Sequence, residues 1–181
     1  KLFLQYNADR LANSDLSFQA TARQEYAKRF YYKNLTGVGE YERRGNGAHI
    51  SLGMQIARLG MLSGFIRLEK MNIHRLSGSI VDAGELNLNT IGLNSVVDTR
   101  DQIPFPTRGK YHTFTYEVSS GKFLGADISF FKVQNQLTTY WTFRNRNTFS
   151  PRFLWGTSDL TTPFSEHYRI GGEDSFYGLR E

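Results

Sequence analysis

Residues capable of covalent or metal chemistry are scarce and scattered in this sequence. The histidines have none of the spacings typical of zinc sites, and no cysteine supplies a thiolate. No Gly-x-Ser-x-Gly segment offers a hydrolase nucleophile, and Arg169-Ile-Gly171-Gly172 lacks the glycine pattern of a phosphate-binding loop. The sequence therefore predicts no enzyme active site, no metal site and no cofactor. The histidines are His49, His74, His112 and His167.

Charged side chains on the polar faces of alternating segments are more informative. If these faces line the interior of a barrel, the charges could bind a returning loop or line a conduit. They could also do no more than solvate a wet interior, and the sequence leaves both interpretations open. Glu173 and Asp174 are candidates for reaching the arginines of this set. The candidates that face the lumen are Arg67, Glu69, Asp127, Arg144 and Arg146.

The elements that would position these residues are strands, because apolar and polar residues alternate with period two along most of the chain. Many of the alternating segments are of ten residues or more, close to the ~9–11 residues that a strand needs to cross a bilayer. The pattern predicts about eight strands, at residues 2–7, 17–30, 50–57, 64–73, 86–98, 110–118, 124–130 and 137–146.

The connections between these segments alternate between long and short, as they do in outer-membrane barrels. Glycine and polar residues predict long loops at 33–47 and 74–85, and a turn with two prolines at 98–109. Short links are expected at 59–63, 119–122 and 134–136, and a change of parity at 90–92 predicts a β-bulge.

Alternation alone does not say whether the apolar face points inward, as in a soluble lipocalin-like barrel, or outward to lipid. Strand length and aromatic residues near strand ends favour the membrane barrel. A formal net charge of +5 without a basic stripe does not predict nucleic-acid binding, so outer-membrane lipids are the expected surroundings. The aromatic residues are Tyr6, Tyr26, Phe30, Tyr116, Phe130 and Trp141.

Two motifs narrow the fold class. The first is Asp98-Thr-Arg100-Asp101 followed by Phe105-Pro106-Thr-Arg-Gly109. The second runs from Pro163 to the end of the chain and contains Arg169, Gly171, Gly172, Phe176, Tyr177, Gly178 and Arg180. They resemble a periplasmic hairpin and the sixth extracellular loop of the bacterial surface-antigen superfamily, which includes BamA-, TamA- and FhaC-type outer-membrane barrels.

The resemblance implies an all-β, transmembrane, antiparallel up-and-down barrel of about 16 strands. Residues 1–181 would be a partial barrel domain that carries about the fourth to the eleventh strand and ends in the sixth extracellular loop. The start at Lys1, without a signal peptide, also predicts a fragment. The implied function is to assist insertion, assembly or translocation of client polypeptides at the bacterial outer membrane, without covalent catalysis.

One residue departs from the family pattern, because Tyr177 precedes Gly178 where the family has an arginine that pins the loop inside the barrel. A phenol cannot replace the two-pronged, permanently charged contact of a guanidinium. Some members of the superfamily have a looser loop motif and carry an upstream patatin-like phospholipase domain. A membrane anchor of such a lipase is therefore the first alternative, and a soluble ligand-binding barrel is the second.

Overall fold

A computed structural model describes residues 2–11, 14–33, 36–57, 59–78, 83–144 and 146–168. Strands dominate this part of the chain, and none of its helices is long and apolar enough to cross a membrane. The strands are β1 (Leu2–Ala8), β2 (Leu16–Lys33), β3 (Thr36–Ile56), β4 (Gly60–Ser77), β5 (Gly84–Asp98), β6 (Gly109–Ser119), β7 (Phe130–Phe143), β8 (Asn147–Phe149) and β9 (Arg152–Ser158). The helices are α1 (Gly121–Leu124) and the 3-10 turn η2 (Phe164–Glu166).

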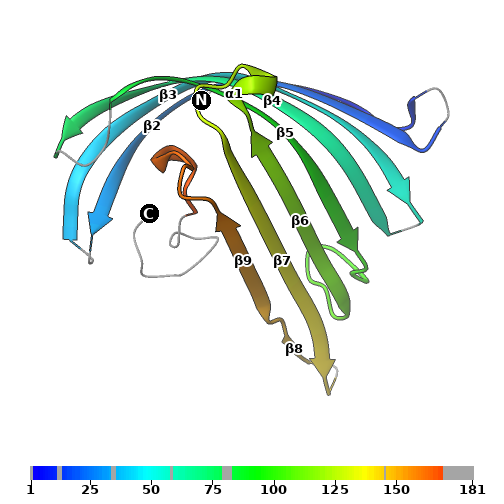
Figure 1. Ribbon diagram of the computed structural model, residues 1–181. Helices are drawn as coiled ribbons and strands as arrows, with labels where there is room; N and C mark the ends of the chain where they lie inside the picture. Colours follow the sequence, from blue (N-terminus) through cyan, green and yellow to red (C-terminus); the bar gives the residue numbers. More distant parts are fainter. Residues whose placement is uncertain are drawn as a thin grey trace.

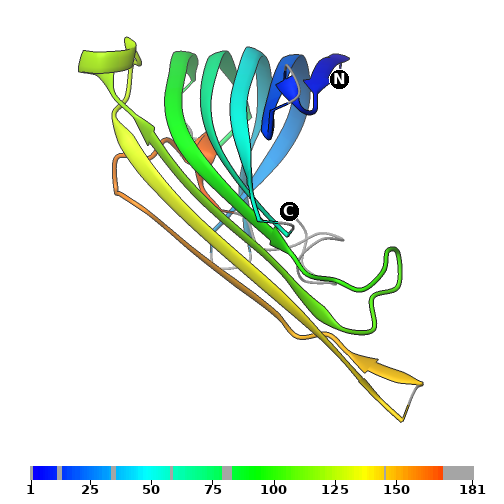
Figure 2. The same ribbon diagram turned by 90° about the vertical axis from the view of Figure 1, so that its right-hand side faces the viewer.

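All strands belong to one curved antiparallel sheet in which each strand from β1 to β7 pairs with the next along the chain (Figure 1). β8 pairs with Trp141–Phe143 and β9 with Lys132–Thr138, so the two short strands together extend the wall beyond β7. β7 and β8 project past the ends of the neighbouring strands (Figure 2). The result is the up-and-down topology of a barrel wall whose sheet is not closed within the described residues.

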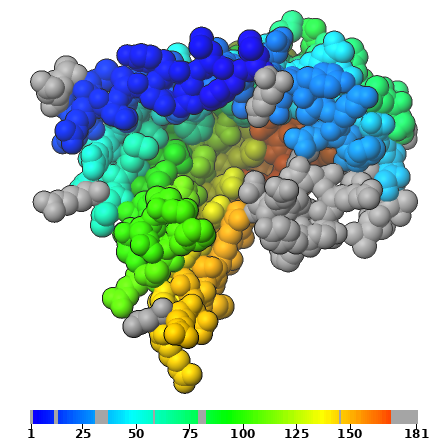
Figure 3. Space-filling view, turned by 180° about the vertical axis from the view of Figure 1, so that it is seen from behind, coloured from blue at the N-terminus to red at the C-terminus, as the bar shows by residue number. Residues whose placement is uncertain are grey.

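The two faces of the curved sheet differ in polarity. Exposed apolar side chains lie on the convex face, among them Leu4, Leu52 and Phe153, which are 74%, 52% and 62% exposed. The concave face carries charged side chains such as Arg43, Arg67 and Glu69. The segment with η2 lies inside the curve of this face (Figures 1 and 3). Apolar residues outside and polar residues inside are the arrangement of a transmembrane barrel and the reverse of a lipocalin. The fold class predicted from the sequence is confirmed.

The predicted loop at 33–47 is wrong, because β3 begins at Thr36 and continues through this glycine-rich stretch. The glycines make room on the concave face instead of turning the chain. A Cβ at Gly45 would lie 2.8 Å from Glu69 Oε1, and one at Gly47 would lie 2.9 Å from the carbonyl oxygen of Leu68. The composition typical of a loop here reflects close packing of the wall against a charged side chain.

One strand boundary and the position of the β-bulges also differ from the prediction. β4 extends to Ser77, so the connection predicted to start at His74 is shorter. The β-bulge predicted at 90–92 is absent from the pairing of β5 with β4 and β6, which is continuous there. Described register shifts occur instead at 31/32 in β2 and at 40/41 in β3.

The last two predicted strands were assigned incorrectly. The turn predicted at 134–136 lies inside β7, whose Gln134 and Gln136 face the wet concave side and whose Asn135 faces outward. The predicted strand at 124–130 covers the end of α1, a connection and only the first residue of β7, Phe130. The eighth wall strand is supplied by β8 and β9, which the alternation pattern missed.

Candidate functional site on the concave face

A cluster of charged side chains crosses the concave face of the sheet. Alternate residues of each strand face this side, and antiparallel register brings the charges of different strands together. Gly47 pairs with Glu69, Arg67 with Thr90, and Glu117 with Lys132. We call this set the lumenal cluster; its members on the wall are Arg23, Glu25, Arg43, Arg67, Glu69, Glu117 and Lys132.

Glu69 is the hub of the lumenal cluster. Its side chain is 1% exposed, and its carboxylate accepts from Nη2 of Arg23 at 2.6 Å and from Nη2 of Arg43 at 2.8 Å. Nη1 of Arg67 lies 3.3 Å from the same carboxylate. Three guanidinium groups thus share one buried carboxylate, which leaves positive charge to be neutralised by other acids.

Arg67 connects the hub to the rest of the cluster. Its Nη2 lies 2.8 Å from Oε1 of Glu117, and its Nε donates to Oγ1 of Thr90 at 3.3 Å. The guanidinium is held in place by groups on β4, β5 and β6, so its orientation is set by the wall. Nη1 and Nη2 of this guanidinium point into the space enclosed by the curved sheet.

Glu166, on η2, brings the final carboxylate to the cluster. Nη1 and Nη2 of Arg67 donate to its two oxygens at 3.3 and 3.2 Å, which is the two-pronged geometry that favours arginine as a partner. Nζ of Lys132 donates to Oε2 at 3.1 Å, and Nη2 of Arg43 lies 3.6 Å from Oε1. The chain after β9 therefore docks on the concave face through one carboxylate and three cations.

Apolar and hydrogen-bonded contacts accompany this ionic contact. The ring of Phe164 packs edge-on against Tyr41, with centroids 5.4 Å apart, next to a buried cluster that includes Met71 and Leu88. The hydroxyl of Tyr168 donates to the carbonyl of Val133 at 2.6 Å. We call residues 159–168 the docked segment.

Glu166 also balances the charge of the cluster. Four cations, Arg23, Arg43, Arg67 and Lys132, face four carboxylates, Glu25, Glu69, Glu117 and Glu166. Without Glu166, four positive charges would face three negative charges, a net charge of about +1 in a partly desolvated place. Docking of Glu166 therefore neutralises the remaining positive charge of the lumenal cluster.

The ionic contact makes docking dependent on pH. Burial alone would raise the pKa of the Glu166 carboxyl, but the charges of Arg67 and Lys132 outweigh it and lower the pKa to about 2. A carboxyl with a lower pKa when docked binds fewer protons in that state than when released. Its contribution is fully present above about pH 4.5 and is lost as the pH falls towards 2.

We expect the docked segment to become mobile between about pH 4.5 and pH 2. The sequence has no cysteine, so a spin label at Leu160→Cys, a fully exposed position, would report on this segment alone. Its mobility should rise on acidification and recover on neutralisation. In a Glu166→Gln background the label should be mobile throughout; an equal pH response in that background would contradict the assignment to Glu166.

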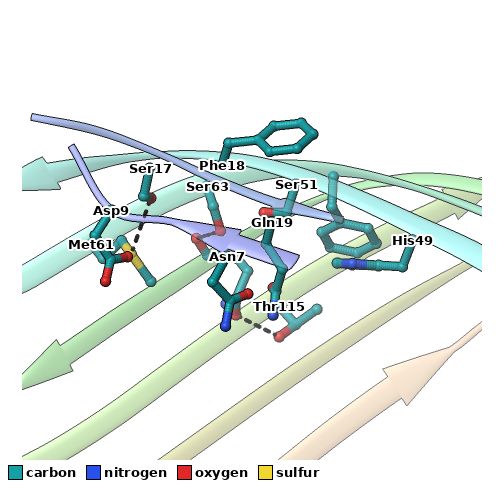
Figure 4. A pocket seen from close by; sticks show the side chains of 12 residues that line it. Asn7, Asp9, Ser17, Phe18, Gln19, His49, Ser51, Met61, Ser63 and Thr115 are labelled. Atoms are coloured by element: carbon teal, nitrogen blue, oxygen red, sulfur yellow. Dashed lines mark hydrogen bonds between the residues drawn. The ribbon is translucent and has the colours of Figure 1, made fainter. Parts of the chain in front are cut away.

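A hollow of about 470 Å³ adjoins the cluster on the concave face, between β1 and β6 (Figure 4). Its lining is mostly uncharged and polar, including Gln19, Ser51 and Thr115, while Phe18 points to the opposite face of the sheet (Figure 4). His49, at one end of the lining, pairs in register with Arg67. The hollow thus lies beside the lumenal cluster.

The structure brings together only part of the predicted lumenal set. Arg67 and Glu69 lie at the centre of the cluster. Asp127 does not face the lumen; it is exposed in the connection before β7 and accepts from the backbone N–H of Asn87 at 2.7 Å. Arg144 and Arg146 are exposed at the β7–β8 turn, because β7 ends at Phe143 and the predicted strand does not continue through them.

The loop-motif residues from Arg169 to Arg180, together with Glu173 and Asp174, lie outside the described residues. Sequence reasoning missed the acid that does reach the arginines, since Glu166 has no periodic signal in a turn. It also missed Arg43, which lay in the predicted loop. Arg23, Glu25 and Glu117 lie within the predicted strands at 17–30 and 110–118, and the alternation that marks Arg67 and Glu69 also assigns them to polar faces. Among the described residues, no group of three or more histidines and acids could hold a metal ion.

The motif at the β5–β6 connection shapes a turn. Arg100 donates through its backbone N–H and Nε to Oδ1 of Asp98, and its guanidinium stacks over Tyr111 at 4.5 Å. Asp101 accepts from the hydroxyl and N–H of Thr107 and from the N–H of Arg108, contacts that lower its pKa to about 2. Phe105 is 80% exposed and Pro106 half-buried at the end of this connection.

Gly109 closes the turn with a φ of +101°, and a Cβ there would lie 2.2 Å from the carbonyl oxygen of Thr99. We expect Gly109→Ala to lower the free energy of unfolding by about 1–3 kcal/mol, because the backbone must leave this conformation. Urea unfolding of the reconstituted barrel would measure the loss. Gly84→Ala, where a Cβ meets no atom within 4 Å, is the matched control and should be nearly neutral.

Comparison with known proteins gives one result of note. A family model described as the Omp85 superfamily domain matches residues 4–181, which is nearly the whole chain. No curated protein matches the sequence.

Proposed function

This chain belongs to the Omp85 superfamily, and on that premise we propose that it is part of an outer-membrane barrel that assists insertion, assembly or translocation of other polypeptides. The superfamily as a whole consists of outer-membrane proteins engaged in protein assembly and translocation. In this proposal residues 1–181 form part of a barrel domain of about 16 strands in the bacterial outer membrane. The chain after β9 is the start of an extracellular loop that returns into the lumen.

The observation that carries the proposal is the docking of Glu166 on the lumenal cluster. The interior of this wall is occupied by a segment held largely through ionic and hydrogen-bonded contacts. Another polar or acidic group can make the same contacts in its place, whereas a packed apolar core accepts only side chains of matching shape. A segment held in this way can leave the interior and return to it, which suits a barrel that handles polypeptides without covalent chemistry.

A second function is supported by the sequence at the end of the chain. Tyr177 stands where the superfamily's loop arginine is expected, as in the looser loops of patatin-linked members. The barrel would then be the membrane anchor of a lipase whose active site lies in another domain. The contact of Glu166 with Arg67 would hold the loop in either case.

The experiment uses the full-length protein in phospholipid vesicles. Urea-unfolded outer-membrane barrel protein is added, and the formation of folded, protease-resistant product is followed over time. We expect faster folding than in empty vesicles and in vesicles with an unrelated barrel of similar size. No acceleration, together with release of fatty acid from the vesicle lipids, would overturn the first proposal and favour the lipase anchor.

A further inference from the structure

The position of Glu166 has the features of a binding site for a carboxylate. All three cations that surround it belong to the wall: Arg43 on β3, Arg67 on β4 and Lys132 on β7. The carboxylate itself belongs to a separate element, the short turn η2. The receptor and its ligand are therefore different parts of the chain, joined through the residues after β9.

We infer that the wall carries a carboxylate-binding site that Glu166 occupies at rest, and that an aspartate or glutamate of a client polypeptide occupies when the docked segment leaves. This inference rests on the proposed function, because it names the chemistry of the partner that the lumen receives. It assigns a ligand class to the lumenal cluster: extended polypeptide with acidic side chains.

Geometry favours a carboxylate over other anions at this position. The guanidinium of Arg67 offers two parallel N–H groups, at 3.3 and 3.2 Å from the two oxygens of Glu166, and Lys132 adds a third donor at 3.1 Å. Arg67 is fixed from behind by Glu117 and Thr90, so it keeps its orientation when the ligand is exchanged. A guanidinium whose orientation is fixed before the ligand binds recognises a planar ligand with two oxygen atoms, such as a carboxylate.

Charge favours an acidic replacement for Glu166. With Glu166 removed, the cluster keeps about one excess positive charge inside the concave face, where Arg67 and Lys132 are 13% and 18% exposed while the segment is docked. Exposed charges would be neutralised cheaply by solvent and salt, but partly buried ones are screened much less. An incoming acidic side chain restores the balance, whereas a lysine or arginine would be repelled.

Access is provided by the hollow beside the cluster. The serine, threonine, asparagine and glutamine side chains in its lining can hydrogen-bond to an extended backbone, and its one carboxylate, Asp9, lies at the β1 side, away from Glu117 on β6. Phe65 and Thr115, which line it, are each two residues along their strands from Arg67 and Glu117. A polypeptide in the hollow would thus place a side chain against the lumenal cluster.

The test measures equilibrium binding to the full-length protein in phosphatidylcholine nanodiscs. The probes are fluorescein-labelled hexaglutamate and, as the matched uncharged peptide, hexaglutamine. We expect weak binding of hexaglutamate to the wild type, because Glu166 competes, and a Kd lower on the order of tenfold in Glu166→Gln. Adding Lys132→Gln to that variant should remove most of the gain, since it withdraws one cation. Glu85→Gln, at an exposed ion pair with Lys70, should leave binding unchanged.

Equal binding of the two peptides to Glu166→Gln, or a gain that survives Lys132→Gln, would overturn the inference. If a variant does not fold, the wild type decides the question: hexaglutamate should increase hydrogen exchange at residues 164–168 and hexaglutamine should not. An unchanged exchange rate with both peptides would also overturn it. Because no client folding is involved, binding can succeed where the vesicle experiment fails, and the two proposals are tested separately.

Discussion

Glutamine in place of Glu69 is expected to destabilise the barrel more than any other single change in the lumenal cluster. The variant leaves Arg23, Arg43 and Arg67 around a neutral amide whose NH₂ group cannot accept from them. Removing one partner of a buried ion pair costs about 3–5 kcal/mol, because the remaining charge is left without compensation. Here the side chain removed is 1% exposed and serves three partners, so the upper part of that range applies.

Urea unfolding of the reconstituted barrel, followed by far-UV circular dichroism, would measure this loss. Glu85→Gln makes the same chemical change at an exposed ion pair, where Glu85 is 59% and Lys70 61% exposed, and it should have little effect because water screens such a pair. Adding Arg43→Gln to Glu69→Gln should restore part of the stability by removing one unpaired charge. Additive losses in the double variant would show that the two residues do not share the network.

Glutamine in place of Glu166 is expected to release the docked segment while the wall stays folded. The variant keeps the shape of the side chain but removes the charge that balances Arg67 and Lys132. Hydrogen bonds to charged groups contribute about 1.5–3 kcal/mol each, and part of that remains with an amide. Amide hydrogen exchange in residues 164–168 should therefore accelerate about 10- to 100-fold, since each 1.4 kcal/mol corresponds to a factor of ten.

The control for this release lies within the same protein. Exchange in β4 and β5 should remain slow in Glu166→Gln, because Arg67 keeps Glu69 and Glu117 as partners. A double variant with the two charges swapped offers a further check. Glu166→Lys combined with Arg67→Glu should restore some of the protection from hydrogen exchange that either change alone removes. Unchanged exchange of the docked segment in Glu166→Gln would mean that Phe164 and Tyr168 hold it without the ionic contact.

Sequence alone was sufficient for the fold class because alternation predicted the strands of the wall and the two motifs resembled those of a family of outer-membrane barrels. It could not say which face was concave; that followed from curvature and from the docked segment. The prediction failed where glycine had a packing role, since Gly45 and Gly47 read as a loop but make room for Glu69. It also failed in β7, where Gln134 and Gln136 read as a turn but face a wet interior.

The candidate site was only partly predictable for a related reason. Arg67 and Glu69 stood out because they share a face of one clear strand. Their partners lie on β2, β3, β6 and β7 and on η2, and only strand register and curvature bring them within reach. Glu166 comes from a turn with no periodicity, so no local pattern connects it with an arginine 99 residues away.

The contacts of the lumenal cluster also depend on the correct register of the strands in the wall. A slip of one residue would turn every side chain of a strand to the other face, and five strands each carry at least one member of the cluster. The slipped charge would then face lipid, where arginine or lysine costs about 2–4 kcal/mol at the middle of the bilayer. Glu166 is the last member of the cluster along the chain. It contacts Arg43, Arg67 and Lys132 together only when β3, β4 and β7 are in register, so it can dock only on a correctly paired wall.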